Sequence, residues 1–299
     1  MIVITGGSGF IGTNLCLTLD ALGLEYRVID KIRSSLCIEQ RTDIASICDY
    51  EAIKKLISHN DIIVHLAAAG NVIESVKNPD TCFNNNILGT FNVLKVCKDV
   101  GIRKLIFAST GGAIAGNNSG LVTEETLPNP ISPYGASKAS CEQLLAAFSA
   151  SYDMKIHILR FANIYGPYSA HKKGLITSIM RSIINNEELL IYGDGNSSRD
   201  YLYVDDLIRL IIFTITNELE FNKLNVATSK SLSINQVLDT TELILQKKIK
   251  KKYMMKRNGE IYINSLSGDL AKTLYGFQPK IDFQTGILKT FQWYEENLR

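Results

Sequence analysis

The sequence predicts an α/β protein with a doubly wound parallel sheet and a smaller, interleaved C-terminal lobe. A short β-branched run at residues 2–5 leads directly into a glycine turn and then into an apolar helical pattern. Further apolar runs at residues 26–29, 61–69 and 104–109 alternate with helical patterns, which is typical of a parallel sheet covered by helices. No repeat, low-complexity segment or linker divides the 299 residues.

The order of these patterns predicts the domain organisation. Residues 1–165 carry the alternating strands and helices and are expected to form a domain of the Rossmann type. Residues 166–299 are expected to form mainly the second lobe, with later segments near residues 190–230 returning to the first domain. The two parts are therefore expected to interleave rather than to be joined by a linker.

Composition and charge exclude several classes of protein. The 32 basic and 30 acidic side chains give a formal charge of +2, so no strong field attracts nucleic acid or an acidic membrane. The longest apolar run, residues 210–215, is far short of the ~20 residues that span a bilayer. The N-terminus passes directly into the first strand without a basic leader, so no signal peptide is expected and the predicted location is cytoplasmic.

The glycine turn has the spacing of a dinucleotide site. Gly6, Gly9 and Gly12 follow a G-x-x-G-x-x-G pattern between a strand and a helix. The first glycine permits the tight turn, the second lets backbone N–H groups approach a pyrophosphate, and the third allows close packing of helix and strand. Asp30 ends the next strand, where its carboxylate can accept hydrogen bonds from ribose hydroxyls. Its negative charge favours NAD over NADP, although basic residues follow it.

Strands and helices continue to alternate after the glycine turn. Ligands bind at the carboxyl ends of the strands in such sheets, and Ser109 and Thr110 close one of these strands. The alanines at residues 67–69 close another, where small side chains suit either a cofactor or a closely packed helix. The predicted elements are a strand near residues 44–48, a helix at 49–58, a strand at 61–66, a long amphipathic helix from 84 to about 100 and a strand at 104–109.

Residues 132–138 place a phenol and an ammonium four residues apart at the start of a predicted helix. Tyr134 and Lys138 then share one face of that helix. A free tyrosine has a pKa of ~10 and is a poor base near neutral pH unless a nearby cation favours its anion. Lys138 is expected to be that cation, which makes the pair a candidate acid–base centre, although the same spacing is common on ordinary surface helices.

No metal site is predicted. The six cysteines show no Cys-x-x-Cys pair and no companion histidines at ligand spacing, so they are expected to be reduced thiols. The four histidines are equally scattered. These residues are Cys16, Cys37, Cys48, Cys82, Cys97 and Cys141, with His59, His65, His157 and His171.

Two C-terminal stretches are interpreted as structural. The basic run at residues 247–252 could attract a membrane surface, but a solvated helix end followed by a charged edge strand is the preferred interpretation. A helix expected from residue 285 should cover a core with one apolar face. This face carries Ile287, Phe291, Tyr294 and Leu298.

Taken together and in order, these motifs resemble those of the extended short-chain dehydrogenase/reductases. Within that family the chain is similar to the NAD-dependent nucleotide-sugar epimerase/dehydratase branch, and most of all to the UDP-glucose 4-epimerases and their relatives. The resemblance covers essentially the whole chain. It is carried by Gly6, Gly9 and Gly12, by Asp30, by residues 65–68, by Asn86 with Gly89 and Thr90, by Ser109 with Thr110, by Tyr134 with Lys138, and by residues 159–167, 192–195, 199–206 and 257–260.

The resemblance implies roles for individual residues. Tyr134 is then the catalytic base, Lys138 lowers its pKa and holds the nicotinamide ribose, and Thr110 hydrogen-bonds the sugar hydroxyl that is oxidised. NAD binding is implied for Gly6, Gly9, Phe10, Ile11, Asp30, Ile47, Leu66, Ala67, Ala68, Tyr134, Lys138 and Phe161. Binding of a UDP-sugar is implied for Ser75, Thr110, Tyr134, Asn163, Arg199 and Arg257, of which the arginines suit phosphate oxygens.

The resemblance favours 4-epimerisation over related reactions. The 4,6-dehydratases resemble one another in an Asp-Glu pair directly after the Thr, and Gly111-Gly112 cannot supply such an acid and base. Decarboxylase relatives usually carry a glutamate in this loop, and ketoreductases commonly use NADP, which Asp30 disfavours. A 4-ketoreductase, a dehydratase and a non-catalytic dinucleotide-binding sensor stay open as alternatives. The paired glycines also add one residue to the loop, so either Ser109 or Thr110 could supply the catalytic hydroxyl.

The size of the sugar and the assembly are also implied by the resemblance. Asn264 lies seven residues beyond Arg257, where 4-epimerases carry a bulky aromatic side chain beside C2 of the sugar. We hypothesise that the smaller Asn264 admits an N-acetyl group, so both UDP-glucose and UDP-N-acetylglucosamine are candidate substrates. A homodimer is implied through two helices, one opening near Asn86 and one carrying Tyr134.

Overall fold

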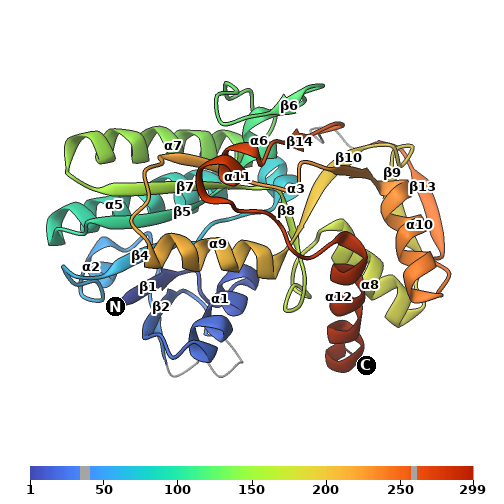
Figure 1. Cartoon of the computed structure of the whole chain (residues 1–299), viewed down its shortest axis with the longest axis horizontal. Helices are drawn as coiled ribbons and strands as arrows, with labels where there is room; N and C mark the ends of the chain where they lie inside the picture. The colour runs from blue at the N-terminus through green and yellow to red at the C-terminus, as the bar shows by residue number, and fades with distance from the viewer. Residues whose placement is uncertain (34–40, 257–260, 299) are drawn as a thin grey trace.

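A seven-stranded parallel sheet forms the centre of the protein (Figure 1). A computed structural model describes residues 1–33, 41–256 and 261–298 of the chain. The strand order is β11-β7-β5-β4-β1-β2-β3, and every neighbouring pair is parallel, which confirms the predicted doubly wound sheet. The strands are β1 Ile2–Thr5, β2 Tyr26–Asp30, β3 Thr42–Ile44, β4 Ile62–His65, β5 Lys104–Thr110, β7 Lys155–Phe161 and β11 Lys223–Val226.

The order of the strands reverses beside β1. From β1 the chain builds outward to β2 and β3, and then returns to place β4 on the other side of β1 before continuing to β5, β7 and β11. Open α/β sheets bind ligands in the crevice at such a reversal, outside the carboxyl ends of the strands. A ligand site is therefore expected in the space outside the carboxyl ends of β1 and β4, which is called the crevice below.

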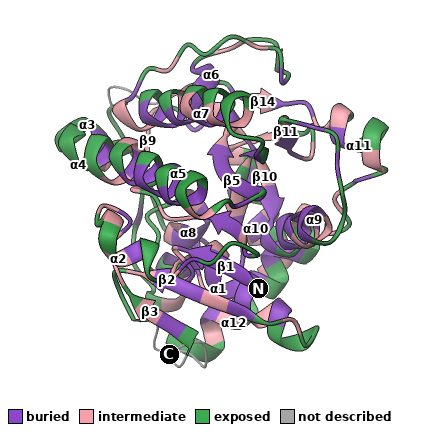
Figure 2. Cartoon of the chain, turned by 90° about the vertical axis from the view of Figure 1, so that its left-hand side faces the viewer, coloured by how far each residue is buried: buried purple, intermediate pink, exposed green. Residues whose placement is uncertain are grey.

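Helices cover both faces of the sheet, and an apolar core lies under each set of helices (Figures 1 and 2). Ile4 joins the core under α1 and α9, whereas its neighbour Val3 joins the core under α2, α5 and α7. This alternation is expected for a strand that is buried on both faces. The helices are α1 Phe10–Ala21, α2 Tyr50–Lys54, α5 Gly89–Val100, α7 Pro133–Ser151 and α9 Val204–Thr216.

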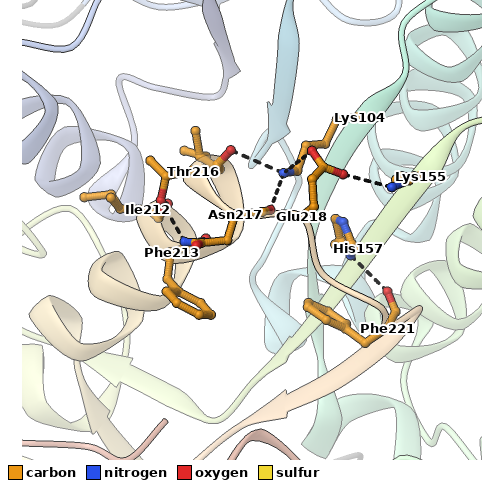
Figure 3. Close-up of polar contacts among 10 residues, drawn as sticks. Lys104, Lys155, His157, Ile212, Phe213, Thr216, Asn217, Glu218 and Phe221 are labelled. Carbon is orange, nitrogen blue, oxygen red and sulfur yellow. Dashed lines mark hydrogen bonds and ion pairs between the residues drawn. The ribbon is translucent and has the colours of Figure 1, made fainter. Parts of the chain in front are cut away.

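The amino ends of β5 and β7 hold the end of α9 in place (Figure 3). Lys104 is buried, and its Nζ donates to the carbonyl oxygens of Asn217 at 2.6 Å and Ile215 at 3.3 Å. A cation at this position complements the negative end of the helix dipole. Beside it, the Lys155 ammonium lies 2.9 Å from the carboxylate of Glu218. These contacts lie at the end of the sheet opposite the crevice, so they fasten α9 without entering the candidate site.

The second lobe lies beside the carboxyl ends of the central strands (Figure 1). Its core is rich in aromatic side chains, including the buried Tyr165, Tyr203, Phe291 and Tyr294. Its elements are β8 Asn163–Tyr165, α8 Leu175–Asn185, β9 Leu189–Tyr192, β10 Ser198–Tyr203, β12 Ser231–Ser233, α10 Ile234–Leu245, β13 Lys251–Met254 and α12 Phe283–Leu298. The remaining elements are α3 Val72–Lys77, α4 Pro79–Cys82, η2 Phe83–Leu88, α6 Gly111–Ala115, β6 Leu121–Val122, β14 Ser265–Leu266 and α11 Asp269–Tyr275.

Two predicted elements differ from the structure. The strand predicted near residues 44–48 is β3, which ends at Ile44 because its pairing with β2 stops there. The helix predicted at residues 49–58 is α2, which is only five residues long. It ends at Lys54, where a tighter turn follows, in which the Leu56 N–H donates to the Ile53 carbonyl at 3.1 Å.

The C-terminal predictions are confirmed with one exception. The basic run leads from the end of α10 into β13, an exposed strand that pairs with β9 in a two-stranded sheet. Ile287, Phe291 and Tyr294 of α12 are buried, whereas Leu298 is 40% exposed because the last turn of the helix projects beyond the lobe (Figure 1). Nowhere in the described part of the chain does a helix have the length and apolar character needed to cross a membrane.

Candidate active site

The glycine turn forms a cradle lined by backbone at the crevice. Gly6 has φ +77°, and a Cβ there would lie only 2.6 Å from the Cα of Ala67, just after β4. Gly9 is the N-cap of α1, so the unpaired N–H groups of the first helical turn begin here. A helix N-terminus and a glycine backbone without side chains fit a pyrophosphate.

The third glycine of the pattern packs differently from the prediction. A Cβ on Gly12 would lie 2.4 Å from the Cα of Gly7, so Gly12 allows α1 to approach the turn itself rather than a strand. The close approach to a strand belongs to Gly7, whose Cβ would lie 2.6 Å from Val28 in β2. Spacing alone could not distinguish the two, because both contacts depend on how the turn folds back.

Asp30 lies beside this cradle at the end of β2. Its carboxylate accepts hydrogen bonds from the N–H groups of Ser8 at 3.0 Å and Ile32 at 3.2 Å. The carboxylate therefore ties the glycine turn to the end of β2. Each oxygen keeps further lone pairs that could accept from ribose hydroxyls.

The other residues with an implied NAD contact fall into two groups. One group follows β4 and is half-buried or exposed, so it borders the crevice; it comprises Leu66, Ala67 and Ala68. The other group contributes side chains to the apolar cores, which leaves mainly backbone atoms for a ligand. Phe10 and Phe161 belong to the core under α1 and α9, against which Ile11 packs, and Ile47 belongs to the core on the other face of the sheet.

The start of α7 presents Tyr134 and Lys138 to the crevice side of the sheet. Ser132 caps the helix by accepting from the Gly135 N–H at 3.1 Å, and Pro133 occupies the first turn. Lys138 is 3% exposed, and its Nζ donates to the Ala108 carbonyl at 2.7 Å. The ammonium is thereby held at the carboxyl end of β5.

Burial, rather than the charge of Lys138, dominates the acidity of the pair. Burial lowers the pKa of Lys138 to about 8, an effect that the nearby Cys141 and Glu142 partly offset. Burial also raises the pKa of Tyr134 above its usual value, with smaller contributions from Cys82 and Cys141. The net shift of the Tyr134 pKa is upward because burial is its largest cause, and a lowering of this pKa by Lys138 stays a prediction.

The two hydroxyls at the end of β5 have different surroundings. Ser109 is buried, and its hydroxyl donates to the Glu142 carboxylate at 2.6 Å. Thr110 is half-buried at the strand end, and its hydroxyl oxygen accepts from the Ala113 N–H at 3.4 Å as the cap of α6. The proton of Thr110 has no acceptor among the described residues, so this hydroxyl is the one that can donate to a ligand.

A buried ion pair that sequence reasoning missed lies directly behind these groups. The Arg160 guanidinium contacts the Glu142 carboxylate through Nε at 3.0 Å and Nη2 at 2.6 Å, and both side chains are almost fully buried. Glu142 also accepts from Ser109, so β5, β7 and α7 meet at one carboxylate. The sequence feature that could have predicted this pair is Glu142 itself, an acid one helical turn beyond Lys138 on the buried face of α7.

Asn86 joins the β4 end to the helix that carries Tyr134. Its side chain accepts from the Ala69 N–H at 2.7 Å and donates to the Ala69 carbonyl at 3.2 Å and the Ser137 hydroxyl at 2.9 Å. The helix predicted from residue 84 is π-helical around Asn86 before it continues as α5. Such irregular turns are frequent at functional sites because they redirect a side chain.

The residues with an implied substrate contact are not all free to make one. The buried Ser75 hydroxyl donates to Val72 and accepts from the Tyr134 N–H at 3.2 Å, so Ser75 supports the start of α7. The exposed Asn163 donates to the Asp200 carbonyl at 3.2 Å. Substrate binding by both stays a prediction.

One of the two arginines holds a backbone segment in place. The Arg199 guanidinium donates to the backbone carbonyls of Ser198, Ile261 and Tyr262, and so holds the segment before β14. Phosphate binding by Arg199 stays a prediction. Arg257 lies outside the described residues.

Asn264 makes contacts that its position seven residues after Arg257 did not predict. It is 2% exposed, and its Nδ2 donates to the carbonyl oxygens of Gly112 at 3.1 Å and Gly116 at 3.2 Å. The carboxamide is therefore committed to the loop that follows Thr110. The hypothesis that Asn264 simply leaves room for an N-acetyl group does not account for this.

His65 connects the end of β4 to α5 through a buried chain of hydrogen bonds. Its Nδ1 lies 2.6 Å from the Thr5 hydroxyl and its Nε2 lies 3.0 Å from the Thr90 hydroxyl. Burial, with a smaller contribution from the charge of Lys138, lowers the pKa of His65 from 6.5 to about 3. The imidazole is therefore neutral in the folded protein near neutral pH.

This neutral histidine predicts a loss of stability in acid. Below pH 6.5 the unfolded chain binds a proton that folded His65 rejects until about pH 3, so the free energy of unfolding should fall by up to about 1.4 kcal/mol per pH unit in this window. His65→Gln should make that fall shallower in urea titrations between pH 7 and pH 4. The exposed His59→Gln is the control and should keep the wild-type slope; equal slopes for all three proteins would contradict the prediction.

Metal binding has no visible basis in the described part of the chain. No three His, Cys, Asp or Glu side chains are grouped as metal ligands within residues 1–33, 41–256 and 261–298. No disulfide joins the cysteines of these segments, and Cys37 lies outside them.

Comparison with known proteins matches this geometry to one family. The model of the NAD dependent epimerase/dehydratase family matches residues 2–227. A crystal structure of UDP-glucose 4-epimerase with UDP-glucose, from Thermotoga maritima, superimposes with a TM-score of 0.93 at 31% identity and covers 100% of this chain and 99% of its own.

Relatives with different reactions also match. A UDP-glucuronate 4-epimerase of Thermodesulfobacterium geofontis is 30% identical over 84% of this chain and 78% of its own length. A dTDP-glucose 4,6-dehydratase of Escherichia coli is 28% identical over 99% of this chain and 94% of its own length. Sequence identity at this level does not distinguish epimerisation from dehydration.

Proposed function

Because the chain belongs to the NAD dependent epimerase/dehydratase family, we propose that it is a nucleotide-sugar 4-epimerase that carries NAD and converts UDP-glucose or UDP-N-acetylglucosamine to the galacto epimer. The observation that carries the choice of epimerisation is the packing of the loop after Thr110. Dehydratases resemble one another in an acid and a base there, and this chain has two glycines.

The space beside those glycines is filled by the second lobe. A Cβ on Gly111 would lie 1.8 Å from the Leu266 Cδ2, and a Cβ on Gly112 would lie 3.1 Å from the Asn264 Oδ1. An Asp-Glu pair at these positions would require the side chains of Leu266 and Asn264 to shift. The packing therefore supports a site without the acid and base that remove water from the sugar.

The residues of the crevice suit a dinucleotide. The glycine cradle at Gly6 and Gly9 would hold the pyrophosphate, and the Asp30 carboxylate would accept from the adenosine ribose. A 2′-phosphate would meet the negative charge of Asp30, which favours NAD over NADP. When bound, NAD supplies a hydride acceptor for C4 of the sugar and later returns the hydride, so that the sugar passes through a 4-keto form.

The side chains would move the proton and hold the sugar. Tyr134, as its phenolate, would take the proton of the O4 hydroxyl and so become the phenol, which returns the proton after the sugar turns over. The buried Lys138 ammonium, held by the Ala108 carbonyl, would keep a positive charge close to the phenolate. Thr110 would donate its free hydroxyl proton to the sugar oxygen and so fix the orientation of C4.

The proposal is tested by NMR of the purified protein without added cofactor. UDP-glucose, UDP-N-acetylglucosamine and UDP-glucuronate are supplied in separate samples, and bound NAD is measured after denaturing release. Appearance of the galacto epimer in any sample supports 4-epimerisation with carried NAD and identifies the sugar. Loss of water from the sugar would indicate a dehydratase, net consumption of NAD(P)H a ketoreductase, and no reaction with NAD present a sensor or a rarer sugar.

We also propose a homodimer formed through the α5 and α7 face. Phe83 is 61% exposed, Leu88 41% and Phe91 39%, so η2 and α5 together carry three exposed apolar side chains. Figure 2 colours parts of α5 as exposed. Exposed apolar side chains in a row mark interaction surfaces. We expect a dimer in sedimentation at micromolar concentration and a monomer for Phe83→Asp. Leu243→Asp, at a similarly exposed position on α10, should stay dimeric; a monomeric wild type would reject the proposal.

A further inference from the structure

The loop after Thr110 cannot hold its shape by its own hydrogen bonds. It contains α6, a helix of only five residues, and isolated helices of this length are unstable. The Gly116 N–H donates to the Gly112 carbonyl at 3.1 Å, and Thr110 caps the other end. The last carbonyl groups of such a short helix need partners from elsewhere in the protein.

Two residues outside α6 supply such partners: the Asn129 N–H donates to the Ile114 carbonyl at 2.8 Å, and Asn264, just before β14, reaches two other carbonyl groups. One carboxamide nitrogen bonds the Gly112 carbonyl and the Gly116 carbonyl, and so spans the helix and the turn that ends it. The nitrogen has two N–H groups, and this arrangement uses both. Because Asn264 is 2% exposed, water cannot replace it readily at these carbonyls.

The chain on either side of Asn264 holds it against the loop. The next residues form β14, which pairs in parallel with β6, and the Ser267 N–H donates to the Val122 carbonyl at 2.8 Å. On the other side the Tyr262 N–H donates to the Asn117 side chain at 2.6 Å. The carboxamide is therefore placed by backbone contacts before and after it, and not by its own rotamer alone.

We propose that Asn264 is a positioning residue, which holds α6 through two carbonyls and thereby sets the Thr110 hydroxyl for the sugar. This inference rests on the proposed function only for its kinetic consequence. The hydroxyl oxygen of Thr110 is bonded to the Ala113 N–H inside the same helix. A displacement of α6 therefore displaces the hydroxyl as well.

Asn264→Asp tests the proposal at nearly constant size. The carboxylate has no N–H to donate and places negative oxygens against two carbonyl oxygens, so α6 should shift. We expect kcat for the UDP-sugar to fall about 10- to 100-fold, as small misplacements of reacting groups do. Bound NAD should change little, because the hydrogen bonds of Asn264 go to Gly112 and Gly116 and not to the glycine cradle or Asp30.

A double-mutant cycle separates positioning from general damage. In a Thr110→Val protein, Asn264→Asp should lower kcat no further, since the hydroxyl that it positions is already gone. Asn92→Asp is the matched control, because Asn92 is also buried and donates to two carbonyls, those of Ile47 and Cys48. Its effect should add to that of Thr110→Val. Additive losses for Asn264→Asp as well would overturn the proposal.

Hydrogen exchange gives a readout that does not need activity. Amides of residues 111–116 should exchange faster in Asn264→Asp and at the wild-type rate in Asn92→Asp. Unchanged protection of these amides would overturn the proposal whatever the sugar. Absence of turnover in the wild-type protein, with protection lost in Asn264→Asp, would instead reject the proposed function and leave the role of Asn264 supported.

Discussion

Tyr134→Phe is expected to lower kcat for the UDP-sugar by about 10²- to 10⁴-fold, the range typical of a lost general acid–base group. The substitution removes one oxygen from the start of α7 and leaves the hydrogen bonds of its backbone unchanged, including that from the Tyr134 N–H to Ser75. Bound NAD should therefore stay at the wild-type level.

The measurement is the rate of epimer formation by NMR together with NAD released on denaturation. Tyr152→Phe is the matched control, because Tyr152 is an exposed tyrosine at the other end of the same helix. It should retain wild-type turnover. A Tyr134→Phe protein with NAD bound and full activity would show that the phenol is not the proton acceptor. The role of Tyr134 would then be limited to binding.

Arg160→Met is expected to cost about 3–5 kcal/mol in the free energy of unfolding, because it leaves the buried Glu142 carboxylate without its cation. Two nitrogens of Arg160 contact this carboxylate within 3.0 Å, and a third donates to the Glu124 carbonyl at 3.3 Å. Urea unfolding at pH 7 measures the loss. Turnover should fall as well, since the carboxylate also accepts from Ser109 beside Thr110.

Two further variants test whether the unpaired Glu142 carboxylate causes this loss of stability. Lys155→Met removes an exposed ion pair with Glu218 and should cost no more than about 1 kcal/mol. Arg160→Met combined with Glu142→Leu removes both charges and should recover much of the stability lost in the single variant, because apolar residues can replace a buried pair. A single variant as stable as the wild type would mean that Glu142 finds another partner or a proton.

The acid–base pair shows which features of the site can be predicted from spacing along the chain. Tyr134 and Lys138 are four positions apart, so a helix brings them to one face whatever surrounds it, and α7 does so. The spacing did not predict that the Lys138 ammonium binds the Ala108 carbonyl or that burial raises the pKa of Tyr134. Desolvation depends on every element packed around the pair, and most of those elements are distant in the chain.

Short-range patterns were sufficient for the sheet and for the glycine cradle. Strand periodicity, the turn at Gly6 and a carboxylate at the end of β2 are properties of a few consecutive residues, because backbone conformation is set mainly by neighbours. The alternation of such segments then allows only a few topologies, of which the doubly wound sheet is one. The boundaries of β3 and α2 were less well predicted, since they end where distant contacts do.

Only the folded chain decided which groups surround the reacting position. Ser109 and Thr110 are adjacent in sequence, yet one hydroxyl is bound to Glu142 and the other is free to donate. Asn264 donates to carbonyl groups about 150 residues earlier in the chain, and no periodic pattern in the sequence predicts this contact. A hydrogen bond requires a particular distance and direction in space, and for residues so far apart these are set by tertiary packing rather than by spacing along the chain.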